Sequence, residues 1–221
     1  RKYDLAIVPS TVSFSRTSHI IALISCANVR VGVSSADGRI NKSAFMLNIK
    51  NDFYWDKNKV HQSIRFLDIS SQIACKTNDE ILNSGIHHSE KEIQKAEDFL
   101  QSAFPDRSIP ILGFHPGAGK PPNRWDVHKF AELIKYVKNN FKCNILITSG
   151  KMDIEVIGIL KELLDKNGID YKIAENFSIR EISAILSEIK LYITNDTGTM
   201  HTAVYSGTPV IALFGPTNGW E

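Results

Sequence analysis

The chain has 221 residues, of which 43% are hydrophobic and 23% charged, values typical of a globular protein with a sizeable core. Its formal net charge of +2 is too small to indicate nucleic-acid binding, which needs a clustered basic face, so no nucleic acid is expected as a partner. No apolar run approaches the roughly 20 residues that span a bilayer, and we expect a cytoplasmic protein.

The three cysteines, Cys26, Cys75 and Cys143, are far apart in the sequence and form no C-x-x-C pair. They therefore predict neither a zinc site nor a disulfide framework. Because each lies in or beside an apolar stretch, we expect buried, inert thiols.

The first part of the chain alternates expected strands and helices. Residues 5–8 form a short apolar run closed by a proline, which predicts a strand buried on both faces. Further patterns predict a helix at 18–27, strands at 29–33 and 44–49, and helices at 61–75 and 90–104. Residues 105–108 then carry a proline and polar side chains, as inter-domain linkers do. We therefore predict two domains, 1–104 and 105–221.

The second part of the chain alternates more regularly. Apolar runs predict five strands, and periodic segments predict four intervening helices, one with a capping box from Ser178 to Glu181. This order predicts a parallel, doubly wound α/β sheet, in which ligands bind beyond the carboxyl ends of the strands. The strands are expected at 109–115, 144–148, 169–174, 191–194 and 209–214, and the helices at 126–140, 153–166, 178–189 and 199–206.

A glycine-rich segment, residues 115–120 (the first loop), follows the first of these strands. Its free amide groups could cradle an anion, with Lys120 or Arg124 completing the charge balance. The segment is neither a Walker A loop nor the G-x-G-x-x-G of a nicotinamide-binding fold. A plain turn between strand and helix remains an alternative.

Residues 195–201 (the second loop) place an acid, hydroxyls and a glycine before a helix. The backbone N–H groups of Thr197, Gly198 and Thr199 would point at a phosphate placed there. His201 lies four residues after Thr197, on the same side of a helix. The alternative is that Asp196 or Thr197 is a plain helix cap and His201 a structural histidine.

Two more loops end at the same expected sheet edge. Asp153, in the loop at residues 149–153, could accept hydrogen bonds from ribose hydroxyls or cap the next helix. Residues 214–218 close the last strand and would flank the second loop. Four polar or glycine-rich loops at one edge together favour a ligand site.

Taken together, HPGAG at 115–119, Arg124-Trp125, NDTGTMH at 195–201 and GTPVIALFGPTN at 207–218 resemble the ADP-heptose:lipopolysaccharide heptosyltransferases, glycosyltransferases of the GT-B fold. The resemblance is strong over residues 109–218 and weaker over 1–104. It implies two Rossmann-like domains. Because the chain begins at an expected buried strand and stops in an expected loop, we expect the first domain to be incomplete and the chain to be a fragment.

The resemblance implies transfer of heptose from ADP-heptose to the inner core of lipopolysaccharide, with inversion, no metal and no cofactor beyond the nucleotide-sugar donor. By similarity, Asp196, Thr197, Gly198 and His201 would hold the diphosphate and sugar, and the first loop would form the facing wall. The residues expected in catalysis are Arg124, Asp196 and His201. The residues expected to bind the donor are Gly117, Ala118, Gly119, Lys120, Asp153, Asp196, Thr197, Gly198, Thr199 and His201.

Two departures from the family pattern affect these expectations. Asn123 stands where family members often have lysine, and Arg124 beside it is not an equivalent replacement. The family's general base is an aspartate early in the first domain, and no residue here matches it. We therefore expect this piece alone to be inactive. Another nucleotide-sugar donor and a non-catalytic nucleotide-binding remnant remain as alternatives.

The acceptor implied by the resemblance is an anionic, lipid-linked oligosaccharide. We therefore expect peripheral contact with the inner face of the cytoplasmic membrane. Positively charged or titratable side chains of the first domain could meet acceptor phosphates, although a solvated surface explains them equally well. These are Arg16, His19, Arg39, Lys57 and Lys59.

Overall fold

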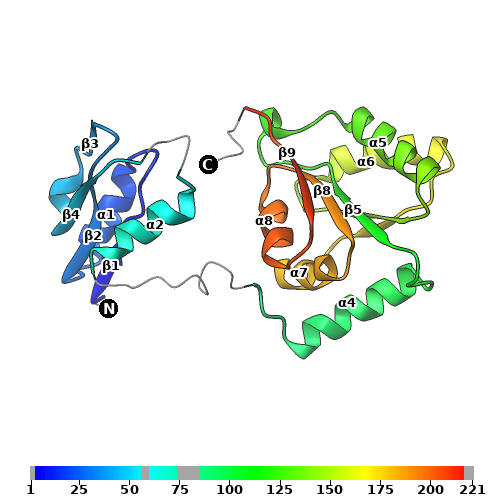
Figure 1. Ribbon diagram of the computed structural model, residues 1–221, viewed down its shortest axis with the longest axis horizontal. Helices are drawn as coiled ribbons and strands as arrows, with labels where there is room; N and C mark the ends of the chain where they lie inside the picture. The colour runs from blue at the N-terminus through cyan, green and yellow to red at the C-terminus, as the bar shows by residue number, and fades with distance from the viewer. Residues whose placement is uncertain (1–2, 56–59, 74–84, 217–221) are drawn as a thin grey trace. The chain divides into compact units, whose positions relative to one another are not determined.

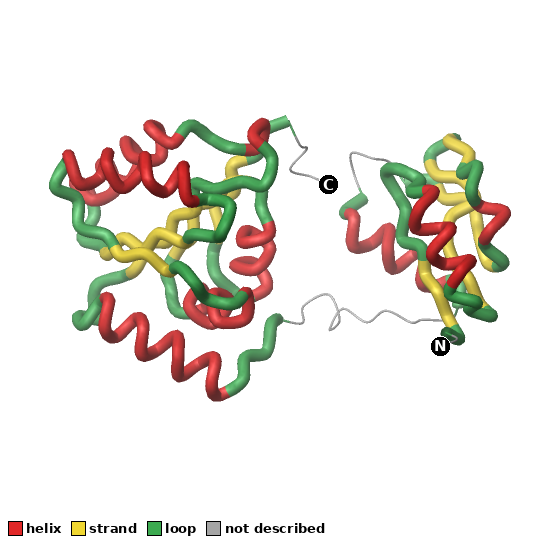
Figure 2. Tube along the Cα trace, turned by 180° about the vertical axis from the view of Figure 1, so that it is seen from behind, coloured by secondary structure: helices red, strands yellow, loops and turns green. Residues whose placement is uncertain are grey.

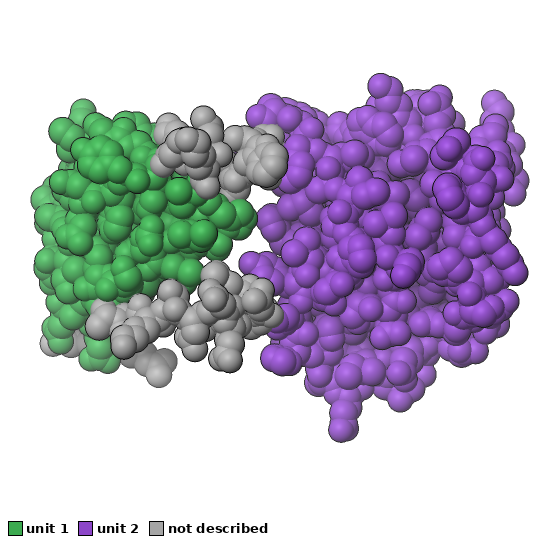
Figure 3. All heavy atoms as spheres, viewed as in Figure 1, with its two compact units in different colours: residues 1–83, 219–221 green, residues 84–218 purple. Residues whose placement is uncertain are grey.

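The computed structural model describes residues 3–55, 60–73 and 85–216. The chain divides between residues 83 and 84 into two compact units, coloured separately in Figure 3. Each has its own sheet, as Figure 1 shows, and its own hydrophobic core. Among the described residues, no helix is long and apolar enough to cross a membrane.

The described part of the first unit is a small α/β layer. Strands β1 (Leu5–Ile7) and β4 (Ile49–Phe53) run parallel to β2 (Val29–Ala36), and β3 (Arg39–Ile40) pairs with β2 in the antiparallel direction. Asp37 and Gly38 have φ values of 50° and 77°, the left-handed geometry that a tight Asp-Gly hairpin requires. Helix α1 (Arg16–Ile24), capped by Ser15, and helix α2 (Gln62–Ser71) complete the unit.

Three predictions for the first unit are wrong. Strand β1 is not buried on both faces, since Leu5 is 42% and Ile7 39% exposed. Residues 44–48 are not in a strand, which begins only at Ile49: Ala44–Met46 form a 3-10 turn, and the Asn41 side chain just before it accepts from the Ser43 N–H. Cys26 is exposed, with a φ of 55°, directly after α1. Cys143 is buried as expected, and Cys75 lies outside the described residues.

Within residues 85–216, the second unit forms a five-stranded parallel sheet in the order β7-β6-β5-β8-β9, confirming the predicted topology. Helices α5 and α6 cover one face, and α4, α7 and α8 cover the other (Figures 1 and 2). The strands are β5 (Ile111–His115), β6 (Asn144–Thr148), β7 (Lys172–Ala174), β8 (Leu191–Asn195) and β9 (Val210–Leu213). The helices are α4 (Glu90–Ala103), α5 (Val127–Asn140), α6 (Ile154–Lys166), α7 (Ile179–Ser187) and α8 (Gly198–Tyr205).

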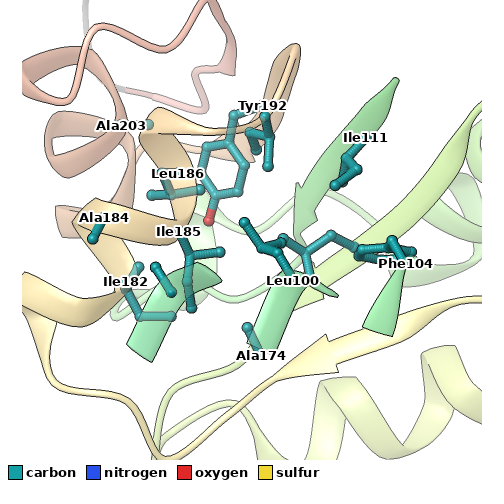
Figure 4. Close-up of a cluster of buried hydrophobic side chains, with 13 residues drawn as sticks. Leu100, Phe104, Ile111, Ala174, Ile182, Ala184, Ile185, Leu186, Tyr192 and Ala203 are labelled. Atoms are coloured by element: carbon teal, nitrogen blue, oxygen red, sulfur yellow. The ribbon is translucent and has the colours of Figure 1, made fainter. Parts of the chain in front are cut away.

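Helix α4 belongs to the second unit, although the sequence assigns it to the first domain. Its Leu100 and the following Phe104 lie in one core cluster with Ile182 and Leu186 of α7 (Figure 4). Salt bridges from Arg180 to Glu92 and from Lys95 to Glu181 reinforce the contact. The division therefore falls before α4 rather than at residues 105–108.

The α4–α7 salt bridges predict a specific acid sensitivity. The hydrogen bond from Arg180 lowers the pKa of Glu92 from 4.5 to about 2, and the hydrogen bond from Lys95 likewise lowers the pKa of Glu181 to about 2. Because both pKa values are depressed in the folded state, their stabilising contribution is present above pH 4.5 and is lost as the pH falls towards 2.

We therefore expect amide exchange in α4 to accelerate between pH 4.5 and pH 2, after correction for intrinsic exchange rates. In Glu92→Gln the change across this window should be smaller, while Glu97→Gln on the same helix serves as a control. An identical pH profile in wild type and Glu92→Gln would contradict this account.

Candidate functional site

The candidate site lies where the strand order in the sheet of the second unit reverses, between β5 and β8. The chain builds β5, β6 and β7 towards one edge, then returns to place β8 on the other side of β5. The loops after β5 and β8 therefore leave the sheet side by side at its carboxyl edge, where α/β sheets bind ligands. These are the first and second loops.

A fully buried amide joins the two loops. The Asn195 Nδ2 donates to the carbonyls of Pro116 at 2.8 Å and Gly117 at 3.1 Å, and its Oδ1 accepts from the Trp125 N–H at 3.0 Å. The side chain at the end of β8 thus fixes both ends of the segment between β5 and α5. Sequence reasoning gave Asn195 no role of its own, although a polar residue ending an apolar run was a signal for one.

Two further contacts tie the predicted catalytic residues to this junction. The Asn123 Nδ2 donates to the Asp196 carboxylate at 3.1 Å, so the residue that departs from the family pattern lies directly against Asp196. The Arg124 Nη2 donates to the Ala118 carbonyl at 3.0 Å, which holds the guanidinium against the first loop. Arg124 and Asp196 are therefore both part of the same loop junction.

The amino end of α8 has no cap from its N-cap residue. Thr197 has an extended backbone and makes no side-chain cap bond; its hydroxyl instead pairs with that of Thr199 at 2.8 Å. The proposed capping role of Thr197 is therefore wrong. Gly198 is exposed, and a Cβ built on it would meet no heavy atom within 4 Å beyond its chain neighbours and the helix's own backbone. His201, one turn into α8, is exposed.

Asp153 is buried beneath the first loop and does not cap α6. Its Oδ2 accepts from the Gly150 N–H at 2.8 Å and lies 3.7 Å from the His115 Nε2. Burial lowers the pKa of His115, with the Asp153 carboxylate opposing the shift. The structure thus places Asp153 as a support for Gly117, which packs against it. A ribose contact by Asp153 stays a prediction.

The remaining predicted site residues are placed less closely together. Gly119 and Lys120 lie exposed at the tip of the first loop. Gly215, after β9, packs its backbone against Pro122, so the loop that follows β9 borders the residues just after the first loop. Thr217 and Asn218 lie outside the described residues.

The structure of the first unit contradicts the expectation that His19 could meet acceptor phosphates. His19 is fully buried, its Nδ1 facing the Ser15 carbonyl at 2.7 Å and its Nε2 the Asn41 amide at 2.9 Å, so it cannot meet an acceptor phosphate. Arg16 and Arg39 are exposed, and Arg39 donates to the Val12 carbonyl at 2.8 Å. Lys57 and Lys59 lie outside the described residues.

The close contact between Gly117 and Asp153 predicts unequal effects for two glycines of the first loop. A Cβ at position 117 would collide with the Asp153 carboxylate, whereas one at 119 would meet no heavy atom within 4 Å beyond its own chain neighbours. Gly117→Ala should lower the free energy of unfolding by about 1–3 kcal/mol, the usual cost of overpacking, with Gly119→Ala much nearer to wild type. Equal denaturant midpoints for the two variants would contradict this packing.

Comparison with known proteins identifies the family of the chain. A family model described as glycosyltransferase family 9 (heptosyltransferase) matches residues 1–220. A lipooligosaccharide heptosyltransferase 2 of Campylobacter jejuni is 25% identical over 178 residues, covering 78% of this chain and 53% of that protein. The chain thus spans about half the length of this curated relative.

Two solved structures share the fold. A glycosyltransferase family 9 protein from Veillonella parvula gives a TM-score of 0.77 at 21% identity, covering 100% of this chain and 59% of its own. The Escherichia coli ADP-heptose lipopolysaccharide heptosyltransferase II gives a TM-score of 0.72 at 21% identity, and the match covers 98% of this chain and 64% of the E. coli chain. These likenesses confirm the predicted GT-B type of α/β fold. With the family model matching nearly its whole length, the chain belongs to glycosyltransferase family 9, the heptosyltransferases.

Proposed function

We propose that the protein containing this chain transfers heptose from ADP-heptose to the inner core of lipopolysaccharide, with inversion and without a metal. Family membership supports the class of reaction. The donor is proposed because the E. coli structure with the same fold is that of an ADP-heptose-dependent enzyme.

The observation that carries the proposal is the amino end of α8. The helix begins at Gly198 without a side-chain cap bond from Thr197, at the edge where the neighbouring strands β5 and β8 end. Helix amino ends present N–H groups and a partial positive charge, which favour anions. We assign this end to the diphosphate of the donor, with the buried amide of Asn195 holding the first loop opposite it.

The charged residues around this end then take different roles. The Asp196 carboxylate would repel a phosphate, so we assign it to sugar hydroxyls, which can donate hydrogen bonds to it. Arg124 and Lys120 supply positive charge near the first loop, and His201 reaches the ligand from the first turn of α8. Asn123, bonded to Asp196, fixes the carboxylate in place.

The chemistry proposed is a single displacement. An acceptor hydroxyl loses its proton to a base, its oxygen attacks the anomeric carbon, and ADP leaves from the opposite face. None of the residues assigned above serves as that base. The contribution of the second unit is electrostatic, because fixed dipoles and cations stabilise the charge that builds on the departing diphosphate.

The acceptor side remains a further part of the proposal. We propose a lipid-linked, anionic oligosaccharide, met at the inner face of the cytoplasmic membrane through peripheral contact. Arg16 and Arg39 of the first unit are exposed cations that suit such a partner.

Turnover assays of the full-length protein test the assignment. The wild-type protein should use ADP-heptose in preference to UDP- and GDP-sugars. Asp196→Ala and His201→Ala should each lower turnover at least tenfold, since groups that act on the transition state have effects of this size or more. Asp170→Ala and His128→Ala, which change exposed residues of the same types elsewhere in the second unit, serve as matched controls.

Preference for another nucleotide sugar would change the donor but keep the reaction class. Absence of transfer with every donor, in a protein that still binds nucleotide, would favour a non-catalytic remnant. Wild-type turnover in both variants would remove Asp196 and His201 from the site.

A further inference from the structure

Asn195 holds two successive peptide groups of the first loop by their carbonyls. Its Nδ2 donates to the Pro116 carbonyl at 2.8 Å and to the Gly117 carbonyl at 3.1 Å. The described peptide bonds are all trans, so the N–H of each peptide group points in the opposite direction to its carbonyl. The N–H groups of Gly117 and Ala118, which belong to these two peptide groups, therefore point away from Asn195.

These two N–H groups make no hydrogen bond to any residue that the structure describes. Gly117 and Ala118 are buried, and buried N–H groups without a partner are rare because an unmade hydrogen bond is costly. A further donor nearby in the chain is in the same situation, since the Arg124 Nε is buried and has no partner among the described residues. Unsatisfied donors gathered in one segment favour a ligand with several acceptor oxygens.

The row of N–H groups continues into the exposed part of the first loop. The Ala118 carbonyl accepts from the Arg124 Nη2 at 3.0 Å, and its peptide group carries the N–H of Gly119. This third N–H also makes no hydrogen bond to a described residue, and Gly119 is exposed. Three successive carbonyls are thus bound by side chains, while the three N–H groups of the same peptide groups remain available.

The direction of these peptide groups decides whether the loop attracts or repels an anion. A carbonyl oxygen carries a partial negative charge and can only accept, whereas an N–H group can donate to phosphate oxygens. Rotation of either peptide group held by Asn195 would exchange its N–H for its carbonyl. Such a rotation would also leave the fully buried Asn195 amide with an unsatisfied donor. The Asn195 side chain therefore favours the direction that suits an anion.

We propose that Asn195 is a positioning residue for donor binding, because it directs the Gly117 and Ala118 N–H groups towards the diphosphate. This inference rests on the proposed function of the α8 amino end, which begins at Gly198, shortly after Asn195. The diphosphate then receives hydrogen bonds from both loops. Asn195 itself is fully buried and acts on the ligand only through the first loop.

The test is calorimetric binding of ADP and of adenosine to the full-length protein. Asn195→Asp keeps the oxygen that accepts from the Trp125 N–H, but places a second oxygen against the Pro116 and Gly117 carbonyls. The variant should weaken ADP binding by roughly tenfold, the size of effect expected when hydrogen bonds to a charged group are lost. Adenosine has no phosphate, so its binding should not change.

Asn167→Asp is the matched control. The Asn167 amide likewise donates to a carbonyl, that of Leu163 at 2.7 Å, and its oxygen accepts from the Lys135 Nζ at 2.8 Å. The substitution makes the same change in charge and removes the same kind of hydrogen bond, but at the carboxyl end of α6. It should leave both affinities unchanged.

Amide proton signals of the wild-type protein test the same geometry without a substitution in the core. Binding of ADP should move the Gly117 and Ala118 amide proton signals downfield, because their N–H groups gain hydrogen bonds to phosphate, and adenosine should not. The Gly198 and Thr199 signals report separately on the amino end of α8. In Asn195→Asp the ADP-dependent shifts at Gly117 and Ala118 should be lost.

Unchanged ADP binding in Asn195→Asp would overturn the proposal, as would equal losses for ADP and adenosine, which indicate a general disturbance of the fold. A wild-type ADP complex in which Gly198 and Thr199 shift but Gly117 and Ala118 do not would also overturn it, and would leave the proposed function intact. A wild-type protein that binds no ADP, or binds it without shifts at Gly198 and Thr199, would instead refute the assignment of the α8 amino end and this inference with it.

Discussion

The site depends on the hydrogen bonds of one buried carboxamide. Asn195 ends β8, and with three hydrogen bonds it holds the first loop at Pro116 and Gly117 and the start of α5 at Trp125. A buried amide left without partners costs about 1–3 kcal/mol, so this arrangement strongly restricts where the first loop can lie. The sheet order makes the contact possible, because β5 and β8 are neighbours although about 80 residues separate them.

Two buried polar systems support the exposed residues from below. Asn195 fixes the first loop, while hydrogen bonds from His115 through Thr148 to Tyr192 connect β5, β6 and β8. Above them, the side chain of Thr197, the N-cap residue of α8, makes no cap bond. A diphosphate bound there would meet the N–H groups and partial positive charge of a helix amino end.

The sequence predicted the second unit well because its signals are local. Strand β6 matches the expected residues 144–148, and Ser178 and Glu181 form the expected capping box. The predictions for the first unit failed where strands are short and half-exposed. Strand β4 carries Lys50, Asn51 and Asp52 in its centre, so it shows no apolar pattern in the sequence. Long-range contacts could not be predicted from the sequence either. Among them are the salt bridges that join α4 to α7 and so place α4 in the second unit. The site loops could be found from glycines and hydroxyls, but not the Asn195 and Tyr192 contacts, which depend on strand order and register.

The most direct measurement is a crystal structure of the full-length protein with bound ADP. The account predicts the two phosphates within hydrogen-bonding distance of the backbone N–H groups at Gly198 and Thr199, with the first loop on the facing side. A diphosphate bound at another edge of the sheet, with the start of α8 covered by protein side chains, would contradict it.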